Sequence, residues 1–314
     1  MSKHDHSDEH AHRHNHGGHG HSHAPASFGR AFCIGIALNL AYVGAEAFYG
    51  LAAHSLALLA DAGHNLGDVL GLVLAWGAAA LSRRQPTQRH TYGFRSTSIL
   101  AALVNAVVLL VVTGGIVWEA IRRISDPEPS AGLTIIVVAA IGIAVNAATA
   151  LLFMSGGGGD LNIRAAFLHM ASDALVALGV VVAGAAILWT GWLWLDPAIS
   201  ILISVVIVAG TWGLLRDSVN LALDAIPAGI DRQAVESYLT GLPGVTEVHD
   251  LHIWGMSTTE SALTAHLVRP DGGPTDALLL SAAHELEKRF GICHATLQIE
   301  TAAQACLLAP SEVV

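Results

Sequence analysis

Charged side chains are scarce in this chain of 314 residues. Asp, Glu, Lys and Arg together make up 13% of the sequence, which is about half of the fraction that is usual in soluble domains. Apolar residues account for 53% before the 32 glycines are counted. So few charges cannot cover a surface that faces water. This composition excludes an ordinary soluble or disordered protein, and it predicts a protein embedded in the lipid bilayer.

Basic side chains and cysteines are also few. The 15 Lys and Arg residues against 25 Asp and Glu give a net charge of −10, so we expect no nucleic-acid partner, because phosphate binding needs clustered positive charge. The three cysteines, Cys33, Cys293 and Cys306, show no paired spacing, which excludes a disulfide framework and favours a reducing compartment. The N-terminal segment is polar rather than apolar, so we expect no secretory signal peptide.

Histidine, in contrast, is abundant, with 18 residues in the chain. Half of them lie among residues 1–27, mixed with Asp, Glu, Ser and Gly. We expect this segment to be a disordered, His-rich cytoplasmic tail that binds Zn²⁺, Ni²⁺ or Cu²⁺ weakly and without fixed geometry. A cloning tag is the alternative, but the irregular spacing of the histidines favours a native segment.

Residues 28–216 hold long apolar runs, and about 20 such residues suffice for a helix to cross a bilayer. We predict an all-α domain of six transmembrane helices at 31–52, 56–81, 97–120, 132–154, 165–190 and 194–215. Seven arginines near the ends of these runs lie on the side of the N-terminus, and two lie on the other side. The positive-inside rule then predicts that both termini are cytoplasmic, with the protein in the inner or plasma membrane.

Residues 217–314 are less apolar and predict a small cytoplasmic α/β domain. The patterns indicate a ferredoxin-like α-β-β-α-β order, with helices at 231–240 and 275–290 and strands at 245–254, 260–268 and 291–300. A domain of this size has a marginal core. We therefore expect it to pair with a second copy, as the metal-binding and dimerisation domain of a homodimer.

Two of the apolar runs carry ionisable residues, which are expensive within a membrane and usually functional. His64 and Asp68 lie in the second run, and His169 and Asp173 lie in the fifth. A spacing of four places each pair on one helix face, and two such helices packed together present two imidazoles and two carboxylates. This set suits tetrahedral Zn²⁺, although Co²⁺ and other divalent ions could enter it. Alternatively, each pair is a structural hydrogen bond within its own helix.

Other polar residues in these runs have less distinctive settings. Asp61 precedes Asp68 by seven residues, and we expect it to cap the start of its helix near the outer surface, with an entry position for the ion as the alternative. We interpret Glu46 and Asn39, Asn105 and Asn146 as groups that hydrogen-bond between helices.

Several stretches resemble the cation diffusion facilitators, a family of zinc-type divalent metal/proton antiporters. They are SLALLADAGH at 55–64 with Asp68, His169 with Asp173, RHTYGFR at 89–95 and VHDLHIW at 248–254. The resemblance implies a dimer that exchanges cytoplasmic Zn²⁺ for external protons at His64, Asp68, His169 and Asp173. It also implies transport rather than enzymatic activity, with Zn²⁺ as the transported and regulatory ion and no prosthetic group.

The same resemblance implies a cytoplasmic metal site at His249, His266 and Glu300. In a regular strand, however, His249 and His252 point to opposite faces, so without a bulge only one of them can join a given site. Exposed surface histidines are the alternative. His90 matches an accessory site in the loop after the second run, but Phe94 stands where its partner is expected, and Ser98 stands where the family often has Glu.

Two other functions fit parts of this pattern. A membrane-anchored metal sensor that regulates partners without transport would use the tail and the cytoplasmic domain, but it would not need the doubled intramembrane motif. An intramembrane metalloenzyme would need an open coordination position for water. Four protein ligands leave none, and the sequence has no H-E-x-x-H motif, so we expect that the protein is not an enzyme.

Overall fold

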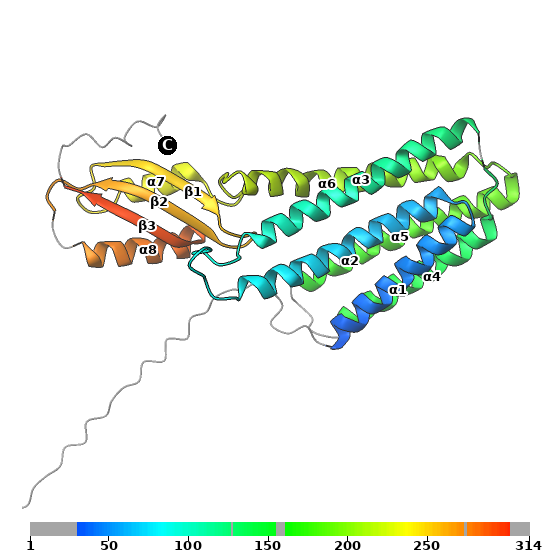
Figure 1. Ribbon diagram of the computed structural model, residues 1–314, viewed down its shortest axis with the longest axis horizontal. Helices are drawn as coiled ribbons and strands as arrows, with labels where there is room; N and C mark the ends of the chain where they lie inside the picture. Colours follow the sequence, from blue (N-terminus) through cyan, green and yellow to red (C-terminus); the bar gives the residue numbers. More distant parts are fainter. Residues whose placement is uncertain (1–29, 127, 155–160, 273–274, 302–314) are drawn as a thin grey trace, which may run out of the picture.

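In the described residues, six long helices run side by side and a small α/β domain lies at one end of them (Figure 1). This computed structural model describes residues 30–126, 128–154, 161–272 and 275–301, so the predicted tail at 1–27 lies outside the described residues. The six helices are α1 (Arg30–Ala52), α2 (Leu56–Ser82), α3 (Thr97–Ser125), α4 (Gly132–Met154), α5 (Leu161–Thr190) and α6 (Leu195–Ala222).

The composition of these helices fits a bilayer. Among the described residues, five helices contain a stretch long and apolar enough to cross a membrane, and the described apolar part of α1, Ile36–Ala52, is shorter. Large apolar side chains point outward from the bundle: Val111 is 69% exposed, Leu175 69% and Trp189 92%. Such a surface is stable in lipid and would aggregate in water. The predicted helical membrane domain is therefore confirmed, although α6 extends beyond the predicted boundary at residue 216.

Close packing between α4 and α5 depends on glycine. A Cβ atom on Gly132 would lie 2.9 Å from the carbonyl oxygen of Gly184, and a Cβ atom on Gly184 would lie 3.1 Å from the carbonyl oxygen of Gly132. The two backbones touch because neither residue has a side chain, as is common where membrane helices cross. This contact fixes α5, which carries Asp173, within the bundle.

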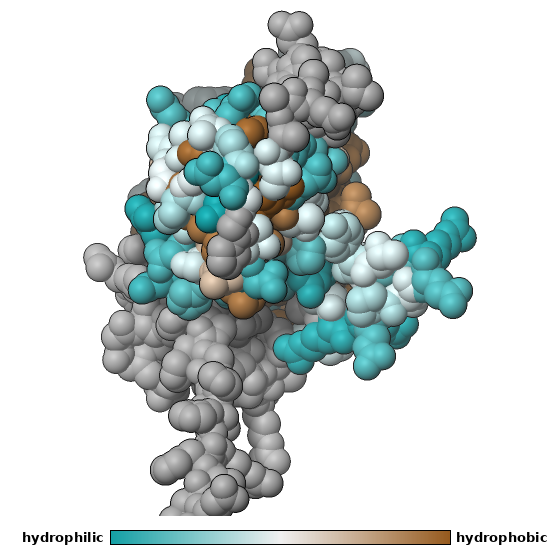
Figure 2. Space-filling view, turned by 90° about the vertical axis from the view of Figure 1, so that its left-hand side faces the viewer, coloured by the Kyte–Doolittle hydropathy of each residue, from teal (hydrophilic) through white to brown (hydrophobic). Residues whose placement is uncertain are grey.

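The C-terminal domain has the predicted α-β-β-α-β order. Its elements are α7 (Arg232–Thr240), β1 (Glu247–Gly255), β2 (Ser261–Val268), α8 (Asp276–Phe290) and β3 (Ile292–Glu300). The sheet has the order β1-β2-β3, with β1 antiparallel and β3 parallel to the central strand β2. Leu239, Leu263 and Leu286 are fully buried between the helices and the sheet. Seen end-on, the described surface of this domain is largely hydrophilic (Figure 2), in contrast to the bundle.

The turn between β1 and β2 contacts the start of α3. Arg95 forms an ion pair with Glu260 (2.9 Å). The Ser96 hydroxyl donates a hydrogen bond to the Met256 carbonyl (3.2 Å), and the Thr258 N–H donates one to the Ser98 hydroxyl (3.1 Å). These contacts connect the C-terminal domain to the membrane domain at a second point, in addition to the chain that leaves α6.

Candidate metal centres

The first candidate centre lies between α2 and α5. The ligand atoms of His64, Asp68 and Asp173 all lie within 4.8 Å of one another. His64 Nε2 is 3.2 Å from Asp173 Oδ1 and 4.0 Å from Asp68 Oδ2. His169 belongs to α5, one turn before Asp173, but its side chain lies outside the described part of the structure. The structure thus brings together three of the four residues that we predicted for this site.

This group can bind a divalent cation. Two carboxylates and an imidazole so close together inside an apolar bundle repel a further negative charge and attract a cation. Mixed nitrogen and oxygen ligands suit Zn²⁺ and neighbouring transition metals better than Mg²⁺ or Ca²⁺. Asp173 is 7% exposed, whereas His64 and Asp68 are 20% and 31% exposed. Asp173 is therefore the most deeply buried member of the group, and the α2 residues are the more accessible ones.

Behind this centre, α1 and α2 share a buried polar cluster. The Tyr42 hydroxyl donates a hydrogen bond to Glu46 (2.7 Å), and the Asn65 amide donates one to the same carboxyl group (3.2 Å). Glu46 is therefore an interhelical hydrogen-bonding group, as predicted. The prediction that Asp61 caps the start of α2 is wrong, because Ser55 is the N-cap residue and Asp61 is 1% exposed beside Glu46.

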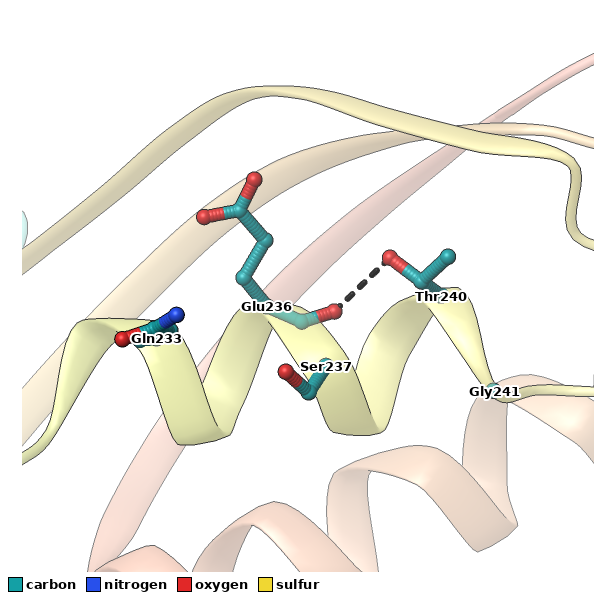
Figure 3. A pocket seen from close by; sticks show the side chains of 5 residues that line it. All are labelled: Gln233, Glu236, Ser237, Thr240 and Gly241. Carbon is teal, nitrogen blue, oxygen red and sulfur yellow. Dashed lines mark hydrogen bonds between the residues drawn. The ribbon is translucent and has the colours of Figure 1, made fainter.

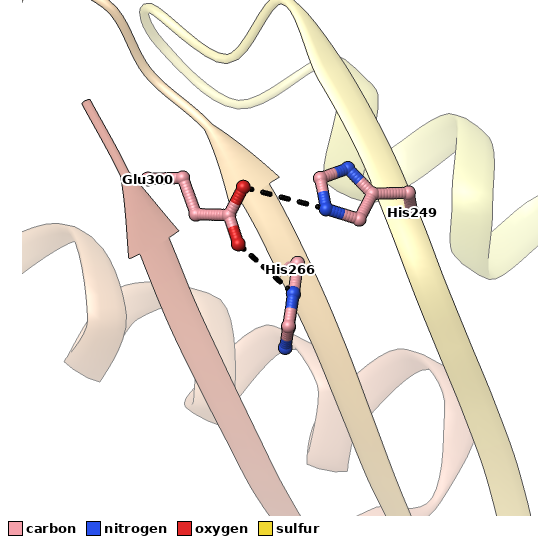
Figure 4. A group of neighbouring side chains, drawn as sticks. All are labelled: His249, His266 and Glu300. Carbon is pink, nitrogen blue, oxygen red and sulfur yellow. Dashed lines mark ion pairs between the residues drawn. The ribbon is translucent and has the colours of Figure 1, made fainter. Parts of the chain in front are cut away.

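The second candidate centre lies on one face of the C-terminal sheet, with one residue from each strand (Figure 4). Glu300 lies between the two rings, with one oxygen 3.4 Å from His249 Nε2 and the other 3.0 Å from His266 Nδ1. The three side chains are 7% to 17% exposed. The alternative of exposed surface histidines therefore does not describe this pair, and a metal ion would find two nitrogens and a carboxylate already oriented.

A β-bulge makes this arrangement possible. His249 pairs with His266 across the sheet and His252 pairs with Thr264, so two residues of β1, Asp250 and Leu251, lie opposite one residue of β2. Asp250 has φ 51°, a left-handed conformation that Asp tolerates better than most residues. The bulge returns His249 and His252 to the same face, which a regular strand forbids.

Residues 32–221 match the family described as "Cation efflux transmembrane domain", and residues 227–302 match "Cation efflux protein, cytoplasmic domain". The chain belongs to the cation efflux family, the cation diffusion facilitators. The resemblance inferred from the sequence motifs is thereby confirmed.

Relatives within the cation efflux family include proteins named as metal transporters. "Zinc transporter ZitB" of Escherichia coli is 40% identical, over 81% of this chain and 82% of that protein. "Cadmium, cobalt and zinc/H(+)-K(+) antiporter" of Bacillus subtilis is 36% identical, over 83% of this chain and 86% of that protein. A solved structure, "Metal-bound C-terminal domain of the CzcD transporter from Cuprividus metallidurans", is 33% identical and covers 23% of this chain and 99% of that chain, with a TM-score of 0.21.

Sequence reasoning missed one polar neighbour of the second centre in this cation efflux protein. Asp250 accepts a hydrogen bond from His252 Nε2 (2.8 Å), and its other oxygen is 3.5 Å from His266 Nε2. Carboxylates in this position hold a ligating histidine in one orientation. The sequence feature that could have indicated this contact is that Asp250 directly follows His249. In a regular strand, however, two successive residues lie on opposite faces of the sheet.

His90 and a hollow beside α7 show less promise as metal sites. The His90 ring lies against Phe94 (4.8 Å between ring centroids), and its Nδ1 is 3.4 Å from the Thr87 hydroxyl. Within the described residues, neither of the two groups of three metal-ligating side chains includes His90.

A hollow of about 560 Å³ lies along one polar face of α7 (Figure 3), lined by Gln233, Glu236, Ser237, Thr240 and Gly241. Its only carboxylate, Glu236, forms an ion pair with Arg232 (3.0 Å).

Proposed function

We propose that this cation efflux protein exports Zn²⁺ from the cytoplasm in exchange for protons, with His64, Asp68, His169 and Asp173 as the transport site. The observation that carries this proposal is the group of His64, Asp68 and Asp173 between two apolar helices, with ligand atoms within 4.8 Å of one another. The identity of about 40% to a zinc transporter over most of both chains supports the choice of ion.

Exchange follows from the chemistry of the ligands. Imidazole binds a metal ion only in its neutral form and carboxylates bind it only when ionised, so protons and Zn²⁺ compete for the same atoms. On the cytoplasmic side Zn²⁺ displaces the protons, and on the outer side protons displace Zn²⁺. Movement of α5 against α2 is the step that changes which side reaches the site, because the site consists of residues from both helices.

The C-terminal domain has the second role in this proposal. Both termini lie in the cytoplasm, and the domain joins two copies of the chain into a homodimer. Zn²⁺ bound by His249, His266 and Glu300 reports the cytoplasmic zinc level, and the contacts between the β1–β2 turn and α3 carry that signal to the membrane domain.

Zinc flux in vesicles tests the transport proposal. The purified protein is reconstituted into liposomes that contain a zinc-sensitive dye, and a pH gradient is imposed. We expect Zn²⁺ uptake that depends on the gradient and that Asp173→Ala abolishes. Asp217→Asn, which removes an exposed carboxylate at the end of α6, is the matched control and keeps the flux. Undiminished flux in Asp173→Ala would refute the site.

The histidine pair on the C-terminal sheet favours a metal sensor without transport as the second candidate. Its two rings and Glu300 are oriented for a metal ion independently of the membrane domain. A sensor binds Zn²⁺ at equilibrium and shows no gradient-dependent flux in the same vesicles, so one experiment separates the two functions.

A further inference from the structure

Two carboxyl groups meet inside the membrane domain behind the proposed transport site. Glu46 of α1 and Asp61 of α2 are 0% and 1% exposed, and their carboxyl groups lie side by side, within reach of a hydrogen bond. The Tyr42 hydroxyl donates to one oxygen of Glu46 (2.7 Å), and the Asn65 amide donates to the other (3.2 Å). The two oxygens of Asp61 are buried, and among the described residues no N–H group donates to either of them.

Among the described residues, His64 is the basic side chain that acts on this pair. Tyr42 on α1, His64 and Asp68 on α2 and Asp173 on α5 are the titratable side chains that act on it. Helix α4 packs against α1 and offers a backbone carbonyl, that of Val138, 3.4 Å from the Tyr42 hydroxyl. Neither α2 nor α4 contains a lysine or arginine.

Two adjacent carboxyl groups in such a setting cannot both be ionised, because burial and mutual repulsion both favour the neutral form. A hydrogen bond between them also requires a proton, since two carboxylates are acceptors only. The Tyr42 hydroxyl and the Asn65 amide donate to the two oxygens of Glu46, whereas Asp61 receives no hydrogen bond from an N–H group among the described residues. One proton is therefore shared between the two carboxyl groups.

We propose that Glu46 and Asp61 form a second proton site, which holds one proton while the transport site is empty and releases it when a divalent cation binds there. This inference rests on the proposed exchange of metal for protons. Asp61 precedes His64 by one helical turn, and Asn65, which donates to Glu46, directly follows His64. A divalent charge so near favours the ionised form of both carboxyl groups. On binding, two positive charges arrive and one proton leaves, so the pair changes from a charge of −1 to −2.

The packing of α4 against α1 leaves room for the side chain that orients Glu46. Gly142 of α4 faces the Tyr42 hydroxyl so closely that a Cβ atom at this position would collide with it. The absence of a side chain leaves room for the Tyr42 ring, which in turn orients Glu46. Three helices thus contribute to the position of one carboxyl group.

Infrared spectroscopy of the full-length protein in nanodiscs tests this proposal, because a protonated carboxyl group has a carbonyl band separate from that of a carboxylate. We expect this band in the metal-free wild type and its loss when Zn²⁺ is added. Asp61→Asn keeps the shape and an amide that donates to Glu46, so the band is absent in this variant. The Asp217→Asn control keeps the band.

Two further variants keep the test decisive. Tyr42→Phe removes one donor to Glu46 but no carboxyl group, so the band is expected to shift and to persist. Asp173→Asn impairs zinc binding at the transport site, so its band is expected to remain when Zn²⁺ is added. The proposal is refuted if the wild type has no band, if Asp61→Asn keeps it, or if Zn²⁺ leaves it unchanged in the wild type. None of these measurements needs transport, so a failure of the proposed flux is recognised separately.

Discussion

Asp196 joins the start of α2 to the start of α6, at the end of the bundle away from the C-terminal domain (Figure 1). Its carboxylate is 2% exposed and accepts three hydrogen bonds. The donors are the Ser55 hydroxyl (2.5 Å), the Leu56 N–H (2.7 Å) and the Ala57 N–H (3.3 Å). The negative charge also lies at the positive end of the α2 dipole and within the field of Arg123, and both stabilise it.

The structure gives the size of the effect when this carboxylate is removed. Asp196→Ala leaves three buried donors without an acceptor, and each unsatisfied buried donor costs about 1–3 kcal/mol. The total loss in the free energy of unfolding is therefore about 3–9 kcal/mol. Ser55→Ala removes the N-cap hydroxyl, which accepts from the Leu58 N–H (3.2 Å), and costs about 0.5–2 kcal/mol. The expected order of stability is wild type, Ser55→Ala, Asp196→Ala.

Unfolding of the purified protein in detergent micelles measures this order, with transport of Zn²⁺ as the second readout. We expect Asp196→Ala to unfold at a clearly lower temperature than Ser55→Ala, and to lose flux because α2 also carries His64 and Asp68. Asp217→Asn controls for the loss of a carboxylate from the same helix, α6. If Asp196→Ala is no less stable than Ser55→Ala, then Asp196 does not hold the start of α2 and the reasoning is wrong.

Three other changes have defined outcomes. Arg95→Glu breaks the ion pair with Glu260 at a cost of about 0.2–1 kcal/mol, and we expect that the zinc flux of this variant no longer responds to cytoplasmic zinc. Adding Glu260→Arg in the same chain should restore the response. Flux assays in vesicles at two internal zinc levels measure it. Gly142→Ala forces a methyl group against the Tyr42 hydroxyl, and we expect it to lower the free energy of unfolding by about 1–3 kcal/mol. Thermal unfolding measures this loss, and an unchanged melting temperature would contradict the contact. Zn²⁺ at 100 times its dissociation constant is expected to stabilise the C-terminal domain by about 2.7 kcal/mol, and a chelator is expected to reverse this stabilisation. Glu300→Gln should abolish the stabilisation, and equal stabilisation in this variant would exclude the site.

The helices of this chain are predictable because lipid permits few alternatives. An apolar run that crosses a bilayer must satisfy its backbone groups internally, so length and composition decide its conformation. The spacing of His64 and Asp68 on one helix face follows from helical geometry in the same way. The approach of Asp173 on α5 to His64 on α2 depends on packing between helices, which no local pattern specifies. Gly132 and Gly184 contribute by permitting the close packing of α4 against α5.

The polar contacts between helices were less predictable for a physical reason. Asp61 and Asp196 are single carboxylates near the start of a helix, and sequence position alone suits either one for the role of a cap. The structure assigns that role to Ser55 and Asp196, which are 141 residues apart in the sequence, and leaves Asp61 beside Glu46. A hydrogen bond between segments so distant in sequence depends on the tertiary arrangement, and a pattern within one segment does not contain it.

The bulge in β1 changes the face on which His252 lies, which the alternation of a regular strand does not predict. Alternation predicts that His249 and His252 face opposite sides of the sheet, and this holds only for a strand without insertions. One additional residue reverses the side of everything that follows it, and Asp250 is the residue type that accepts the left-handed conformation which the bulge imposes. The same residue then receives a hydrogen bond from His252 and lies beside His266. The backbone irregularity and the polar contacts therefore have one cause, and replacing Asp250 would disturb both the sheet register and the orientation of the candidate ligands.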